Sequence, residues 1–110
     1  MLTQKQIRTL SSNLSSSLNS YHRSLAKKIE FTVYSDEIHF SAIVDGQEFT
    51  RVISLYVAEG KKMVGYVVTK NDGATYSWGS EAECSIADFV NSTSGLMPEI
   101  VDGMLHDIGL

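Results

Sequence analysis

Residues 30–58, EFTVYSDEIHFSAIVDGQEFTRVISLYVA, alternate apolar and polar side chains over most of their length. A period of two is typical of β-strands, because successive side chains point to opposite faces of a sheet. Asp36-Glu37 is expected to form a turn between the first two strands. Asp45-Gly46 is the strongest hairpin signal, because both residues tolerate positive φ. The stretch therefore predicts three antiparallel strands joined by short turns.

The third strand, expected at 47–58, has one irregularity in its alternation. In a regular strand Arg51 would lie on the same face as the apolar Ile53. A residue left unpaired between Phe49 and Ile53 would restore the alternation of apolar and polar side chains. We therefore predict a β-bulge there. Downstream, the pattern predicts a turn at 59–62, a strand at 63–69, a turn at 70–73 and a fifth strand at 74–78. Tight turns join antiparallel neighbours, so the whole region is expected to be a meander.

The residues before the sheet show a helical period. Their apolar positions share one arc of a helical wheel, and the basic residues lie opposite; the apolar set is Ile7, Leu10, Leu14, Leu18, Tyr21, Leu25 and Ile29. Thr3 and Gln6 have the spacing of a capping box, so one long amphipathic helix should begin near Gln4. We expect this helix to pack on the protein's own sheet, while packing on a partner is the alternative.

Two short helices are expected after the sheet. Ser80 and Glu83 have capping-box spacing before an apolar stripe that includes Phe89 and Val90. Pro98 suits the first residue of a final helix, in which Ile100, Val101, Met104, Leu105 and Ile108 share one face. The sequence thus predicts a single α+β domain over 1–110: an N-terminal amphipathic helix, a five-stranded antiparallel meander and two short C-terminal helices. Helices should cover one sheet face, and the other face should be open or paired with a second copy. Exposed edges also favour a homodimer.

Charge is distributed unevenly along the chain. The 110 residues carry a net charge of −4, yet residues 1–29 hold five cations and no acid, while all 13 acids follow. Such a split indicates either a basic segment lying on an acidic body or a surface for a partner. A basic, serine-rich, acid-free N-terminus also has the composition of an organellar transit peptide. The lone Cys84 cannot form an internal disulfide, which favours a cytoplasmic location. No apolar run has the roughly 20 residues of a membrane span.

Catalytic and metal-binding patterns are weak in this sequence. Cys84 has no histidine near it in sequence to act as a base. Glu99, Asp102 and His106 share one helix face with ligand-like spacing, but that face lies opposite the buried stripe and is expected to be solvated. The glycines form no phosphate-binding loop. We therefore expect a non-enzymatic protein with no cofactor and no metal.

Protein binding is the function that the pattern favours. Tyr34, His39 and Tyr56 fall opposite the more apolar positions of their strands, and Tyr66 joins them if the fourth strand has the matching register. Tyrosines bury much area at low entropic cost. Arg23 and Lys27 on the basic helix complete the candidate partner-binding residues. We expect docking on another protein, as an inhibitor or as a chaperone or adaptor.

Two other functions remain open from the sequence. One is nucleic-acid binding by the basic helix, although the acidic remainder of the chain makes this less favourable. The other is a small enzyme whose site combines residues distant in sequence, for which a deep pocket lined by His39 or Cys84 would be the sign.

Overall fold

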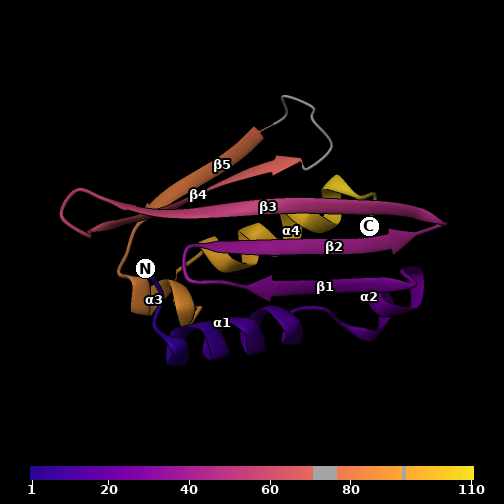
Figure 1. Cartoon of the computed structure of the whole chain (residues 1–110), viewed down its shortest axis with the longest axis horizontal. Helices are drawn as coiled ribbons and strands as arrows, with labels where there is room; N and C mark the ends of the chain where they lie inside the picture. The colour runs from indigo at the N-terminus through magenta and orange to yellow at the C-terminus, as the bar shows by residue number, and fades with distance from the viewer. Residues whose placement is uncertain (71–76, 93) are drawn as a thin grey trace.

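A computed structural model describes residues 1–70, 77–92 and 94–110 of the chain. Its elements follow the predicted order (Figure 1). They are α1 (Gln4–Ser16), α2 (Ser20–Leu25), β1 (Lys28–Val33), β2 (Glu37–Val44), β3 (Gln47–Ala58), β4 (Met63–Lys70), β5 (Ser77–Glu83), α3 (Ile86–Val90) and α4 (Leu96–Asp107). The predicted α+β class, with a five-stranded antiparallel sheet and two C-terminal helices, is confirmed.

The sheet is a meander in which each strand pairs with the next, in the order β1-β2-β3-β4-β5. The predicted hairpin is present: Asp45 and Gly46 have φ of 52° and 78° and join β2 to β3. The predicted turn at 59–62 is also present, with positive φ at Glu59, Gly60 and Lys61. The turn predicted at 70–73 and the start of the strand predicted at 74–78 fall in or beside residues 71–76, outside the described residues.

The long N-terminal helix was a wrong prediction, because the structure has two helices. α1 begins as expected, with the Thr3 side chain accepting from the Gln6 backbone N–H at 3.1 Å. Asn19 then adopts an extended conformation (φ −88°, ψ 176°) and caps α2, its side chain accepting from the His22 backbone N–H at 3.0 Å. The apolar stripe therefore ends at Leu18.

Three further sequence predictions need correction. β3 pairs with β2 in one uninterrupted register from Gln47 to Ser54, so there is no bulge. β5 continues to Glu83, so Ser80 lies in a strand; the capping box of α3 is instead Ser85 with Asp88. The final helix begins at Leu96, two residues before Pro98.

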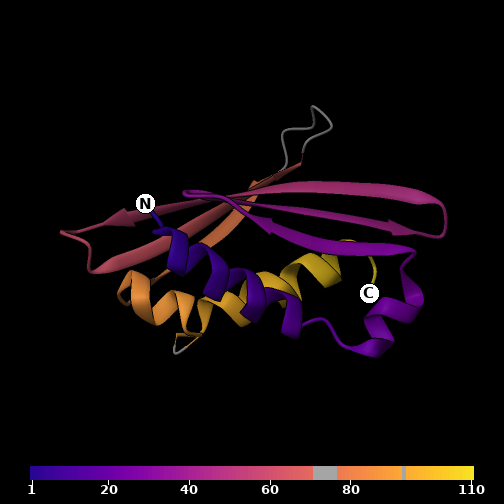
Figure 2. The ribbon, with the colours of Figure 1, turned by 60° about the horizontal axis from the view of Figure 1, so that its bottom comes forward.

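All the long helices lie on one side of the sheet, as expected from the open-face prediction (Figure 2). α1 runs beside β1, and α4 crosses beneath the sheet. The Asn13 side-chain amide ties α1 to α3 by donating to the Val90 carbonyl at 2.8 Å. The residues enclosed in this core are Leu10, Leu14, Ile38, Phe40, Ile53, Val64, Val68, Phe89, Ile100 and Met104.

Candidate functional site

The strand register divides the sheet into two faces. The alternate residues that include Ile38, Ile53 and Val64 point to the helices and are buried. The remaining positions form what we call the uncovered face: the even-numbered residues of β1 and β3 and the odd-numbered residues of β2, β4 and β5. No helix of the described chain lies on this side (Figure 2).

Tyr34 and His39 form an aromatic pair on the uncovered face, beside the turn between β1 and β2. Their ring centroids are 4.7 Å apart, with an interplanar angle of 59°. The His39 Nε2 lies 2.8 Å from the Glu37 Oε1, which fixes the imidazole on its other side. Tyr34 remains 47% exposed, so much of its ring is available for contact. His39 is opposite Val52 on β3, which extends this cluster toward the middle of the sheet.

Tyr56 forms a second aromatic site on the same face and spans three strands. It is opposite Gly65 on β4, and a Cβ at Gly65 would overlap the tyrosine ring, so the ring lies across the glycine. Its hydroxyl donates to the Glu81 Oε2 on β5 at 2.8 Å. This hydrogen bond is the main reason that the pKa of Tyr56 is raised above its usual 10.0. Val67, 39% exposed, is a neighbouring apolar side chain on this face.

Tyr66 does not join this cluster, because the register of β4 turns it toward the helices. It is opposite Leu55 and is 1% exposed. Its ring packs edge-on against Trp78, with centroids 5.7 Å apart, and its hydroxyl donates to the Glu99 Oε1 on α4 at 2.8 Å. Burial, followed by the bond to Glu99, raises the pKa of Tyr66 far above 10.0. Tyr66 was predicted to bind a partner only if the register of the fourth strand placed it beside Tyr56. The structure shows the other register, so this prediction for Tyr66 is wrong.

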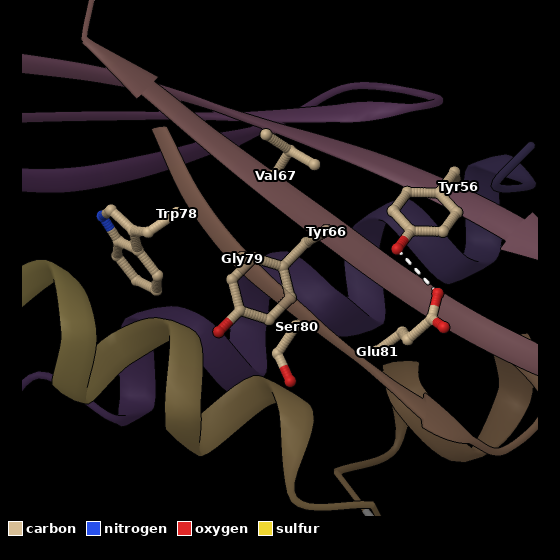
Figure 3. Close-up of a pocket in the computed structure, with 7 residues that line it drawn as sticks. All are labelled: Tyr56, Tyr66, Val67, Trp78, Gly79, Ser80 and Glu81. Atoms are coloured by element: carbon tan, nitrogen blue, oxygen red, sulfur yellow. Dashed lines mark hydrogen bonds between the residues drawn. The ribbon is translucent and has the colours of Figure 1, made fainter. Parts of the chain in front are cut away.

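A shallow depression of about 310 Å³ lies at β5 (Figure 3). Its lining includes Tyr56 and Glu81 from the uncovered face and Tyr66 and Trp78 from the covered face, so it straddles the strand near Gly79. A Cβ at Gly79 would overlap the Tyr66 carbonyl, which shows how closely β5 approaches β4 there. Neither His39 nor Cys84 lines this depression. It is therefore not the deep pocket that would have supported the hypothesis of a small enzyme.

The uncovered face is acidic. It carries Glu30, Glu37, Glu48, Glu81 and Glu83, against Lys28, whose Nζ lies 3.3 Å from the Glu30 Oε1. Sequence analysis did not place Glu81 and Glu83 on this face, because the fifth strand was expected to end at Trp78. A surface of this kind attracts a partner of positive charge.

The basic residues Lys5 and Arg8 lie on α1 and Arg23 lies on α2, on the helical side of the sheet. Lys27 is not on a helix: it lies between α2 and β1, where its backbone N–H donates to the Ile43 carbonyl at 2.8 Å. Arg23 turns back along the helices, where its Nη2 donates to the Ser15 carbonyl at 3.1 Å. The Lys and Arg ion pairs among the described residues are Lys28–Glu30 and Arg51–Asp107, so Lys5, Arg8, Arg23 and Lys27 form none with the described acids. Among the five cations of residues 1–29, Lys28 is thus the one that forms an ion pair with an acid of the described residues.

The described residues show neither a metal-binding cluster nor a membrane-spanning helix. Within residues 1–70, 77–92 and 94–110, no three His, Cys, Asp or Glu side chains gather as a metal site would need, and no helix is both long and apolar enough to cross a membrane. Comparison with models of known protein families, with curated proteins and with solved structures finds no match.

Proposed function

We propose that this protein is a non-enzymatic binding module that docks on another protein through the uncovered face of its sheet. The observation that carries this proposal is the set of half-exposed apolar side chains, Tyr34, Tyr56 and Val67, on a face that no described helix covers. Tyrosines are favoured at the energetic centres of interfaces, because the rigid ring buries much area and the hydroxyl can form a hydrogen bond with a polar group of the partner.

The charge of the face indicates the chemistry of the partner. Glutamates surround the aromatic side chains, so the matching surface on the partner is expected to be basic. Attraction between the two surfaces would accelerate association at low salt and would weaken as salt screens it. Both versions of the docking module, an inhibitor that occludes a partner's functional surface and a chaperone or adaptor that shields one, use such a face. We propose the cytoplasm as its compartment, where the free thiol of Cys84 stays reduced.

The experiment compares capture of proteins from the native host by three tagged chains. Wild type is set against the double variant Tyr34→Ser/Tyr56→Ser and against Tyr21→Ser, a matched control in which a 63% exposed tyrosine on α2 is changed. We expect the double variant to lose a discrete protein that wild type and the control both retain. Equal capture by all three chains, or capture of none, would remove the uncovered face as the docking surface.

A second candidate function, nucleic-acid binding, is favoured by four cations of residues 1–27 that form no ion pair with a described acid: Lys5, Arg8, Arg23 and Lys27. Exposed arginines and lysines contact phosphates, and such binding weakens steeply with salt. A salt-dependent gel shift that disappears in Arg23→Glu/Lys27→Glu would support this function over docking by the sheet.

Homodimerisation is a third proposal, and the uncovered face bears on its geometry. Two copies docked face to face would bring their glutamates together, which costs free energy. A closed homodimer uses the same surface on both copies, so it is expected to form through a surface other than the uncovered face. Light scattering at micromolar concentration distinguishes a dimer from a monomer of 12.1 kDa.

A further inference from the structure

β5 is an edge strand whose outer side pairs with no described segment. The Cys84 N–H donates to the Lys62 carbonyl at 3.0 Å, which continues the β4–β5 register by one pair. Hydrogen-bonded and non-hydrogen-bonded positions alternate along an antiparallel pair. Even positions 78, 80 and 82 therefore direct their backbone groups to β4. Gly79, Glu81 and Glu83 direct their N–H and C=O groups outward, where another strand can bind them.

The other edge of the sheet is arranged differently. The Tyr34 N–H donates to the Glu37 carbonyl at 2.8 Å, so the same alternation makes Ile29, Phe31 and Val33 the residues of β1 with outward backbone groups. The side chains of these residues point to the covered face, and α1 runs alongside β1 (Figure 1). At β5 the residues with outward backbone groups have their side chains on the uncovered face. An incoming strand therefore has free access at β5.

The side chains along β5 set the composition of such a strand. Its residues on the uncovered side would lie beside Gly79, Glu81 and Glu83, and those on the other side beside Trp78 and Ala82. Carboxylates attract lysine and arginine, while the indole and the depression near Gly79 accept apolar side chains (Figure 3). This pattern selects an extended segment that alternates basic and apolar residues.

We propose that β5 accepts an extended, lysine- or arginine-containing segment of a partner protein as a sixth strand of the sheet. This inference rests on the proposed function as a protein-binding module and names one mode of binding. A second copy of β5 suits the edge less well. Antiparallel pairing of two β5 strands would bring Glu81 and Glu83 of both copies onto one face of the joined sheet, and like charges on neighbouring strands repel.

The test selects random ten-residue peptides, displayed on phage, for binding to the full chain. We expect the selected peptides to alternate Lys or Arg with apolar residues. For one such synthetic peptide, the Kd measured by fluorescence anisotropy should rise about tenfold or more in Glu83→Pro, which removes an outward N–H without removing a bond to β4. Glu81→Lys should weaken binding similarly by reversing the charge. Asp36→Lys, the same reversal of charge at an exposed residue of the turn between β1 and β2, should alter the Kd less than about twofold.

Circular dichroism and the Tm of each variant establish that the sheet is intact. Selection of no peptide above background, selection of acidic peptides, or equal binding to wild type and Glu83→Pro would overturn the inference. Analytical ultracentrifugation tests the other occupant: a wild-type dimer that becomes a monomer in Glu83→Pro would assign the edge to a second copy and would also overturn it. Each of these results leaves the Tyr34/Tyr56 capture experiment free to succeed or fail separately.

Discussion

The covered and uncovered faces of the sheet are made by alternate residues of the same strands, but their charged side chains differ in exposure to solvent. On the covered face, Arg51 is 6% exposed and its Nε donates to the Asp107 Oδ2 at 2.7 Å. On the uncovered face, Glu48, Glu81 and Glu83 are exposed to solvent. A buried charge without a partner costs several kcal/mol, whereas a solvated one costs little. Side chains on the covered face are thus constrained by folding, and those on the uncovered face are available for binding.

The largest expected effect compares two leucines of the predicted apolar stripe. Leu14 is fully buried, and Leu25 on α2 is 41% exposed. Leu14→Asp should lower the free energy of unfolding by roughly 4 kcal/mol or abolish folding, because it buries an unpaired carboxylate. Leu25→Asp should cost about 0.5 kcal/mol or less. Urea denaturation followed by circular dichroism measures both, and equal losses would contradict the break between α1 and α2.

The buried ion pair gives the next effect. Asp107→Ala leaves Arg51 buried without its carboxylate and should cost about 3 kcal/mol in unfolding free energy. Replacing both partners by apolar residues, as in Arg51→Met/Asp107→Leu, should recover most of that loss, because no buried charge remains. Urea denaturation of the three chains checks this. A double variant no more stable than Asp107→Ala would show that the pair does not act through its charges.

Two glycines, one on each side of the sheet, test the difference between the covered and uncovered faces, because an aromatic ring lies across each glycine. A Cβ at Gly103 on α4 would overlap the partly buried Trp78 ring at the edge of the core, and a Cβ at Gly65 would overlap the Tyr56 ring on the uncovered face. Gly103→Ala should cost about 1–3 kcal/mol, because the indole is confined between β5 and α4. Gly65→Ala should cost less than about 1 kcal/mol, because the exposed Tyr56 ring can rotate away. Thermal melts of both variants test this difference, and an inverted order would contradict it.

The pH dependence of stability gives the smallest effect. Burial and the bond to Glu99 raise the pKa of Tyr66, so the folded chain keeps this proton above pH 10.0, where an unfolded tyrosine loses it. The stability from the protonated tyrosine is fully present below pH 10.0 and is lost as the pH rises toward the folded pKa. Urea denaturation from pH 8 to 11 should show a steeper decline for wild type than for Tyr66→Phe. Parallel declines would indicate that Tyr66 is not held in its protonated form.

The hydrophobic periodicity and the turn residues predicted most of the fold from the sequence. The bulge prediction failed because it depended on a contact between residues that are distant in sequence. Asp45-Gly46 and the alternation in 31–44 predicted β1, β2 and their hairpins, because these signals are local. The bulge was predicted because a buried arginine is costly, and the sequence could not show that Asp107, 56 residues away, neutralises Arg51. A side chain of α4 therefore determines whether β3 can stay regular.

The residues of the candidate surface could be predicted only where the sequence also predicts the register of their strand. His39 and Tyr56 lie on one face because β2 and β3 are joined by a tight hairpin of defined register. Tyr34 joins them because it continues the β1–β2 register by one residue, its N–H donating to the Glu37 carbonyl. The position of Tyr66 depended on the 59–62 turn, whose length turns it inward opposite Leu55. Ser80 and Glu83 have the spacing of a capping box, but cross-strand pairing with β4 prevails over that local signal.

The most direct test of docking by the uncovered face is site-specific photocrosslinking in the native host. A photoreactive phenylalanine analogue replaces Tyr34, Tyr56 or, as the control on α2, Tyr21, and the adducts are identified by mass spectrometry. We expect adducts with one discrete protein of basic surface to form from positions 34 and 56 and not from position 21. Adducts that form only from position 21, or that are absent from 34 and 56, would contradict the assignment of this face to a partner.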